Sequence, residues 1–174
     1  MKDKQIIVLM GGPSEEAEVS RRTGAAIAEA LVSKGYKAQT LELNPRTVLK
    51  DIDSLGGEVV FNAIHGRYGE DGALQGLLEM AEIPYTGSGI MAHAVGMNKK
   101  VSKDVFKGAN IPTARSESYN GNLESAEAII DHIRKEFTIP VVVKSATQGS
   151  SIGVTIVREE SQLEAAVTEA LKYD

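Results

Sequence analysis

Residues 144–153 read KSATQGSSIG and place a lysine, two glycines and three serines in one short stretch. The part from Gly149 to Gly153 fits the G-x-S-x-G spacing of the serine-hydrolase nucleophile elbow. The same small residues suit a loop whose backbone N–H groups and hydroxyls bind phosphate oxygens, with Lys144 adding a positive charge. A mobile surface hairpin with a solvated lysine would also explain them. The residues after the loop bear on this choice.

The sequence after the loop argues against a hydrolase. Residues 152–157, IGVTIV, alternate and contain β-branched residues, which indicates a strand where a nucleophile elbow requires a helix. Such hydrolases place the acid and the histidine after the serine, whereas His65, His93 and His132 all precede Ser151. The pattern therefore predicts a hairpin, and the phosphate-binding and solvated interpretations both remain open.

A second glycine-containing segment, GGPSEEAEVS, occupies residues 11–20. It is not G-x-G-x-x-G, so dinucleotide binding is not predicted. Three glutamates, Glu15, Glu16 and Glu18, lie between a strand and a helix, where the helix N-terminus favours carboxylates. A glutamate there could bind a small ammonium group, but an acidic first turn that only caps the helix is an equally good explanation.

The third segment, HGRYGEDGALQG, spans residues 65–76 and contains four glycines. The glycines allow tight backbone paths, and His65, Arg67, Glu70 and Asp71 are gathered in one loop. One histidine with two carboxylates is a thin ligand set for zinc, so no metal site is predicted. Taken singly, a histidine such as His65 is more often a hydrogen-bonded loop residue than a catalytic one.

The elements that must position these segments follow two patterns. In the first half, short apolar strands at residues 5–10, 37–43 and 58–64 alternate with helices at 19–34 and 73–81, which predicts an α/β, Rossmann-like parallel sheet. Gly35 stands where a helix C′ residue belongs.

The second half has a different pattern. It shows helical runs between residues 91 and 108, a helix at 123–137 with Asn122 as its N-cap, and strands at 139–145 and 154–157. A capping box at Ser161–Glu164 predicts a last helix that continues to the end of the sequence. We predict a domain boundary near residue 95.

Composition excludes several classes of function. The net charge of −5 and an aromatic content of 5% with no Trp argue against nucleic-acid binding. The absence of Cys excludes disulfides and thiolate metal sites and fits a reducing compartment. No apolar run is long enough for a signal peptide or a membrane span, so we expect a cytoplasmic protein.

HGRYGEDGALQG resembles, position for position, the signature H-G-x-x-G-E-D-G-x-L-Q-G of the D-alanine–D-alanine ligases. Along the rest of the chain, GGPSEEAEVS resembles that family's first loop, PYTGSGIMAHAVGMNKKVSK its passage into the central domain, and VVVKSATQGSSIG its phosphate loop. The resemblance implies an ATP-grasp enzyme. Residues 1–95 would form the N-terminal substrate domain, and residues 96–174 the first α+β lobe of the ATP-grasp domain, truncated at its C-terminal end.

The resemblance also implies roles for individual residues. Glu16 matches the glutamate that holds the ammonium of the first D-alanine, and His65 the histidine near its carboxylate. Ser150 matches the serine that hydrogen-bonds that glutamate. The residues matched to ATP binding are Lys99 and Lys144, on the phosphates, and Gly149, Ser150 and Ser151, in the loop over the β- and γ-phosphates.

For the complete enzyme the family implies a homodimer that joins two D-alanines through an acyl phosphate for peptidoglycan synthesis, using ATP and Mg²⁺. Family members place the metal ligands and the adenine site beyond residue 174, so the chain alone is expected to be inactive. A ligase for D-alanyl-D-lactate or D-alanyl-D-serine, and a non-catalytic ATP-grasp protein, remain alternatives.

Three positions depart from the family pattern. Ser145 stands where Pro is usual, Asn98 where Asp is usual, and Gln148 where an acid is common. The loss of Pro is expected to loosen the entry to the loop.

Overall fold

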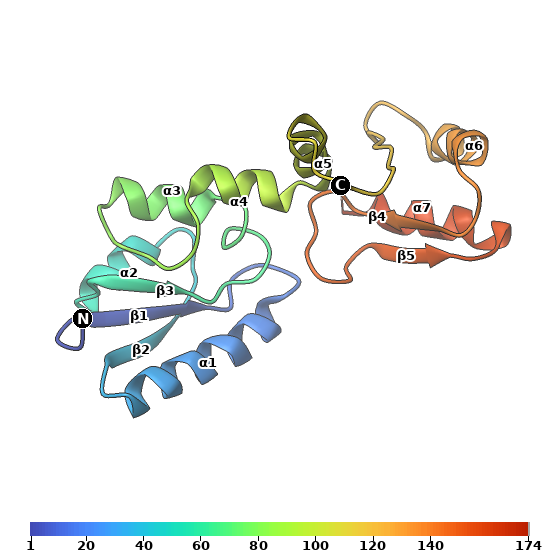
Figure 1. The fold of residues 1–174 in the computed structure, drawn as a ribbon. Coiled ribbons are helices and arrows are strands. Elements are labelled where there is room, and N and C mark those ends of the chain that lie inside the picture. Colours follow the sequence, from blue (N-terminus) through green and yellow to red (C-terminus); the bar gives the residue numbers. More distant parts are fainter. Residues whose placement is uncertain (174) are drawn as a thin grey trace. The chain divides into compact units, whose positions relative to one another are not determined.

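The computed structural model describes residues 1–173. The chain divides into two compact units, Met1–Gly96 and Met97–Asp174 (Figure 1). None of the helices in the described part of the chain is long and apolar enough to cross a membrane.

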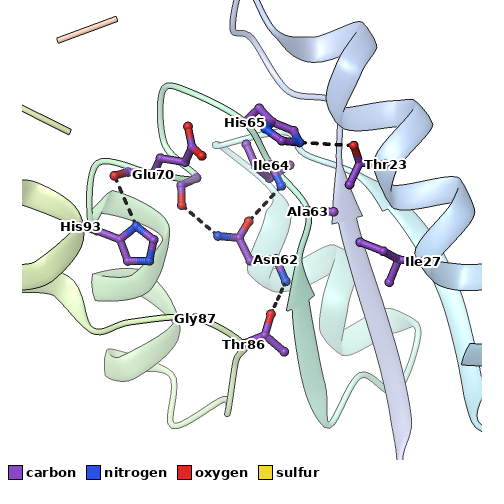
Figure 2. Close-up of a pocket in the computed structure, with 11 residues that line it drawn as sticks. Thr23, Ile27, Asn62, Ala63, Ile64, His65, Glu70, Thr86, Gly87 and His93 are labelled. Carbon is purple, nitrogen blue, oxygen red and sulfur yellow. Dashed lines mark hydrogen bonds between the residues drawn. The ribbon is translucent and has the colours of Figure 1, made fainter. Parts of the chain in front are cut away.

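The first unit is built on a parallel sheet of three strands. β1 (Gln5–Met10) lies between β2 (Lys37–Glu42) and β3 (Val59–Asn62), in the order β2-β1-β3. The backbone near Tyr85 forms a parallel bridge to Val60 on the outer side of β3. At the end of β3 the Asn62 N–H donates to Thr86 Oγ1 at 3.0 Å (Figure 2). The predicted parallel sheet is confirmed.

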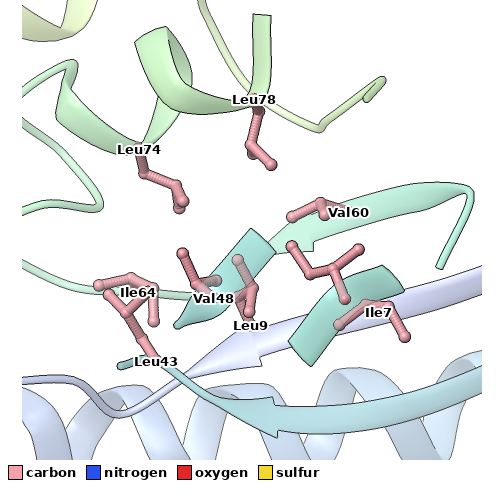
Figure 3. Packing of buried hydrophobic residues seen from close by; sticks show 9 residues of the cluster. Ile7, Leu9, Leu43, Val48, Val60, Ile64, Leu74 and Leu78 are labelled. Atoms are coloured by element: carbon pink, nitrogen blue, oxygen red, sulfur yellow. The ribbon is translucent and has the colours of Figure 1, made fainter. Parts of the chain in front are cut away.

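Helices cover both faces of this sheet because β1 is apolar on both faces. Ile7 and Leu9 pack in one cluster with residues of α2 (Val48–Ser54) and α3 (Ala73–Met80) (Figure 3). Val8 points to the opposite face, towards α1 (Ala17–Ser33). A parallel strand that is covered on both faces has a continuous run of apolar residues, and this is the pattern from which the strand at residues 5–10 was predicted.

The helices observed in the first unit agree only partly with those predicted from the sequence. Helix α2 was not predicted; it has seven residues, of which only Val48 and Ile52 are buried. Gly35 follows α1 with a positive φ of 79°, as predicted for a C′ residue. The last helix, α4 (Ile90–Met97), has no buried residue.

The second unit contains an antiparallel hairpin packed against helices. β4 (Val141–Lys144) pairs with β5 (Val154–Val157), which confirms the predicted hairpin. The helices are α5 (Lys99–Gly108), α6 (Ala126–Glu136) and α7 (Leu163–Ala170), the last preceded by a 3₁₀ turn, η1 (Glu160–Gln162). The core contains Ile129, Ile130, Ile133, Val157, Leu163, Ala166 and Val167.

The predicted helix starts in this unit were wrong in detail. The N-cap of α6 is Ser125, whose hydroxyl accepts from the Ala128 N–H at 3.3 Å. Asn122 instead lies in a turn, where its N–H donates to Asn120 Oδ1 at 3.0 Å. Both residue types favour N-caps, so the sequence could not choose between them.

The capping box before the last helix is also shifted. It joins Glu159 and Gln162 at the start of η1, rather than Ser161 and Glu164. The helix itself ends at Ala170, so the expectation that it continues through Tyr173 was wrong.

Candidate functional site

In the first unit, β1 and β3 end at the same edge of the sheet, where open α/β sheets bind their ligands. The loops after these strands contact each other, because Ser14 Oγ donates to the His65 carbonyl at 2.9 Å. A Cβ added at Gly66, where φ is +72°, would lie 3.1 Å from Glu16 Oε2. The structure therefore brings the Glu16 and His65 loops together.

The Glu16 side chain does not cap the helix that it precedes. Glu16 is the N-cap residue of α1, yet its carboxylate makes no cap hydrogen bond. Only its backbone carbonyl takes part, accepting from the Ser20 N–H at 3.0 Å. Since no ion pair or hydrogen bond within residues 1–173 uses this half-buried carboxylate, the capping explanation for Glu16 is not supported.

Glu70 and Asp71 hold the backbone of the loop that precedes α3, residues 65–72, which we call the signature loop. Glu70 Oε2 accepts from the Gly66 N–H at 2.7 Å. Asp71 accepts from the Tyr68 N–H at 2.9 Å and from the Ala73 N–H, at the start of α3, at 3.0 Å. Over residues 1–173 there is no group of three His, Cys, Asp or Glu side chains that could hold a metal ion.

Two amide side chains, those of Asn62 and Gln75, also hydrogen-bond to the backbone of this loop. The carbonyl of Gly69 accepts from Asn62 Nδ2 at 2.8 Å and from Gln75 Nε2 at 2.7 Å. Gln75 is fully buried although it is polar. Neither residue was predicted to take part in the site. A signal was present, because a glutamine beside Leu74 on the buried face of a helix needs a partner.

A pocket of about 230 Å³ lies beneath this loop (Figure 2). On one side, His65 Nε2 lies 3.3 Å from Thr23 Oγ1, and on the other, His93 Nδ1 lies 3.3 Å from the Glu70 carbonyl. A carbonyl can only accept, so His93 Nδ1 carries a proton there. The lining residues are Thr23, Ile27, Asn62, Ala63, Ile64, His65, Gly69, Glu70, Thr86, Gly87 and His93.

In the second unit, two lysines border the loop between β4 and β5. Lys144 is the last residue of β4 and is exposed. Lys99, at the start of α5, reaches the loop twice: its N–H donates to the Ala146 carbonyl at 2.9 Å, and its ammonium donates to the Gln148 carbonyl. The structure therefore places Lys99, Lys144 and residues 149–151 around one loop.

The tip of this loop exposes small polar residues. Ser150 has a positive φ of 51°, and both Ser150 and Ser151 are exposed. Neither hydroxyl has a hydrogen-bond partner among the described residues. The loop continues into β5, whereas a nucleophile elbow requires a helix at that point. The nucleophile-elbow interpretation is therefore excluded.

The base of the loop between β4 and β5 is closed by two hydrogen bonds from Ser145. The Ser145 N–H donates to the Gly153 carbonyl at 3.0 Å, and its hydroxyl donates to the Ala170 carbonyl at 3.1 Å. Serine at this position supplies two donors that proline lacks, and the expected loosening of the loop entry stays a prediction. At the second departure, Asn98 caps α5 by accepting from the Val101 N–H at 3.1 Å.

Comparison with known proteins shows the family. A model described as "D-ala D-ala ligase N-terminus" matches residues 37–88, and one described as "D-ala D-ala ligase C-terminus" matches residues 105–174. The D-alanine–D-alanine ligase of Moorella thermoacetica is 47% identical over 98% of this chain. The chain belongs to the D-alanine–D-alanine ligase family. The similar ligase of Geotalea uraniireducens is 45% identical over the whole chain.

Solved structures of D-alanine–D-alanine ligases confirm the predicted fold class. The Bacillus anthracis ligase matches 98% of this chain with a TM-score of 0.77 at 31% identity. The Coxiella burnetii ligase matches 99% of it with a TM-score of 0.79 at 26% identity. The chain spans 55% of the length of the Moorella ligase and 54% of the Geotalea one. It thus corresponds to about half of these relatives.

Proposed function

We propose that this protein acts as an ATP-dependent ligase that joins two D-alanines. Family membership supports this proposal, together with the Glu16–His65 region and the hairpin loop. The first D-alanine would be activated as an acyl phosphate and then attacked by the amine of the second, giving the dipeptide for peptidoglycan synthesis in the cytoplasm. A ligase of this kind works mainly by orienting a carboxylate and neutralising phosphate charge.

The first unit would hold the first D-alanine. Glu16 offers a carboxylate that no other described residue uses, and it stands at a helix N-terminus beside Gly66. An ammonium group is the natural partner for such a carboxylate. His65 follows on the adjacent loop and lines the pocket, so it would lie near the carboxylate of the same substrate.

The second unit would hold the ATP phosphates. Gly149, Ser150 and Ser151 present backbone N–H groups and hydroxyls at an exposed tip, which suits the oxygens of a polyphosphate. Lys99 and Lys144 add positive charge beside that tip. ATP, when bound, supplies the γ-phosphate that activates the carboxylate. The described residues fit ATP, but they offer no cluster for Mg²⁺.

The observation that carries this proposal is that two lysines, Lys99 and Lys144, lie beside one small hairpin loop. If the hairpin were only a surface feature with a solvated lysine, there would be no need for Lys99, which is 49 residues earlier in the sequence, to bind the carbonyl of Gln148 in the loop. The pairing of Ser150 with Glu16 and the formation of a homodimer remain predictions from the family.

A hybrid enzyme tests the proposed function. Residues 1–174 would replace the matching part of the Moorella thermoacetica ligase, and phosphate release would be measured with and without D-alanine. We expect release that depends on D-alanine, and a loss of about 1.5–3 kcal/mol in ATP binding or turnover for Lys144→Ala. Lys135→Ala, an exposed lysine on α6, is the matched control.

A folded hybrid that releases no phosphate, or releases it independently of D-alanine, would contradict the ligase assignment. Because the 174 residues span about half of the relatives' length, we expect the chain by itself to bind ATP no tighter than about millimolar and to show no turnover.

A further inference from the structure

Ser145 forms two hydrogen bonds at the base of the loop between β4 and β5. It is 2% exposed and uses both its donors. Its N–H bonds to the Gly153 carbonyl, directly beyond the last ladder pair of Lys144 and Val154. Its hydroxyl bonds to the carbonyl of Ala170, the last residue of α7. Ser145 thus joins the loop to the end of a helix.

The hydroxyl bond occupies a position where water cannot easily replace it. The last carbonyls of a helix have no partner inside the helix, and a carbonyl only accepts, so the Ser145 hydroxyl must be the donor. The same carbonyl accepts from the Tyr173 N–H at a longer 3.3 Å. Removal of the buried hydroxyl would leave the Ala170 carbonyl with only this weaker bond.

Gly153 completes the base. A Cβ at this position would lie 2.0 Å from Ser145 Oγ and 3.1 Å from Tyr173 Cδ2, and φ is +62°. Only glycine fits this backbone conformation and this space without strain. Ser145, Gly153, Ala170 and Tyr173 therefore form one packed group, which we call the loop base.

The tip of the loop is closed by weaker contacts than the base. There the Ile152 N–H donates to the Gly149 carbonyl and the Val154 N–H to the Ser151 carbonyl, both at a long 3.2 Å. Lys99 is a further anchor, but it bonds to Ala146 and Gln148 on the first half of the loop. Neither of these two bonds reaches the second half of the loop.

We propose that Ser145 is a positioning residue that holds the loop tip, Gly149–Ser151, in the conformation that binds phosphate. The identity of the ligand rests on the proposed ligase function. A tip that is already ordered loses less conformational freedom on binding, so it binds more tightly.

Two variants of the 174-residue chain distinguish the contribution of the Ser145 hydroxyl from that of the Ser145 N–H. Ser145→Ala removes the hydroxyl and keeps the N–H, whereas Ser145→Pro removes both donors. The control is Ser161→Ala, an exposed serine in η1 of the same unit. The readouts are amide hydrogen exchange along residues 141–157 and the dissociation constant for ATP from an NMR titration.

We expect Ser145→Ala to speed exchange at Ile152 and Val154 by about tenfold, and Ser145→Pro by more, while the Val143 and Thr155 amides change by less than about threefold. The ATP dissociation constant should rise about three- to tenfold in Ser145→Ala and stay unchanged in the control. Unchanged exchange at the tip, uniform acceleration over the whole hairpin, or a loosened tip with unchanged ATP affinity would each overturn the proposal.

The two proposals can fail separately. If the unaltered chain shows no ATP-dependent shifts, the proposed ATP site fails. In that case the exchange measurement alone still decides whether Ser145 orders the loop tip.

Discussion

The signature loop of the first unit and the hairpin loop of the second unit are both rich in glycine, but they are held in different ways. Glu70, Asp71, Asn62 and Gln75 bind the backbone of the signature loop along its length. The hairpin loop is held at its base and by Lys99, and its tip is exposed. The two acids of the first loop therefore serve structure, whereas Lys144 beside the second loop is exposed.

This difference shows that a motif rich in acidic residues need not be a catalytic one. In H-G-x-x-G-E-D-G, the two acids hydrogen-bond the backbone of the loop that carries His65, and Glu16 lies next to this loop at Gly66. A rigid platform suits a small substrate that must be oriented, and an exposed tip suits a flexible polyphosphate. Substitutions in the two loops should therefore have different effects.

The largest effect is expected from Gly69→Ala in the signature loop. The added Cβ would lie 2.3 Å from Ile64 Cβ and 2.7 Å from the Ile64 carbonyl oxygen, so the backbone must shift. We expect a loss of about 3 kcal/mol in the free energy of unfolding of the first unit. Urea unfolding measures it.

Gly76→Ala is the matched control for that substitution. Gly76 lies in α3, and its added Cβ would meet nothing closer than Ile90 Cδ1 at 3.7 Å. Alanine should therefore stabilise the helix by up to about 1 kcal/mol. Equal effects of the two substitutions would mean that the signature loop is not rigidly packed.

Asp71→Ala compared with Ser151→Ala tests the contrast directly. Asp71→Ala leaves the Tyr68 and Ala73 N–H groups without their acceptor, one of them at the start of α3, so we expect a loss of about 2 kcal/mol. Ser151→Ala should change the unfolding free energy by less than about 0.5 kcal/mol, because its hydroxyl bonds to nothing in residues 1–173. Thermal or urea unfolding measures both changes. Similar losses of unfolding free energy in the two variants would contradict the proposed difference between the loops.

Glu16→Gln should affect the substrate and not the fold. In the hybrid ligase we expect the KM for the first D-alanine to rise about tenfold, while the KM for ATP and the unfolding free energy stay nearly constant. Steady-state kinetics with each substrate varied in turn measure this. Equal rises in both KM values would show that Glu16 is only structural.

The smallest effect concerns acid stability near the Glu16 loop. A hydrogen bond from the Arg21 guanidinium, helped by the Gly12 N–H, holds the pKa of Glu42 below its ordinary value of 4.5. The pair therefore stabilises the fold above pH 4.5, and that stabilisation is lost as the pH falls through the lowered pKa. Because both side chains are nearly half exposed, the contribution should be under about 1 kcal/mol.

Glu42→Gln tests this with urea unfolding at several pH values. The variant should be slightly less stable than the unaltered chain at neutral pH, and the difference should vanish in acid. A difference that stays constant down to about pH 3, below the usual range of a glutamate, would contradict the assigned role of the Arg21–Glu42 pair.

Much of the fold was predictable because apolar runs and glycine turns specify it locally. The strands at Gln5–Met10 and Val154–Val157 coincide with the observed ones. The helix α2 was missed because only Val48 and Ile52 are buried in it, too few for a helical period. The N-cap of α6 was misplaced because Asn122 and Ser125 are both good caps, and tertiary packing decides between them.

The binding roles of the candidate site residues stay predictions. Glu16, His65 and Lys144 could be chosen from residue type and position in the sequence, whereas Lys99 was chosen from the family resemblance. The support from Ser145 could not be foreseen, since its hydroxyl reaches Ala170, 25 residues later. Contacts over such separations depend on the packed fold.

The most direct test is an NMR titration of the ¹⁵N-labelled 174-residue chain with ATP. If the hairpin loop binds the phosphates, saturable shifts should appear at Lys99, Lys144 and Gly149–Ile152, with a dissociation constant of about millimolar or weaker. The Lys144→Ala variant should reduce them, and Lys135→Ala should not. Shifts confined to the first unit, or no shift at the loop, would contradict the assignment of this loop to ATP.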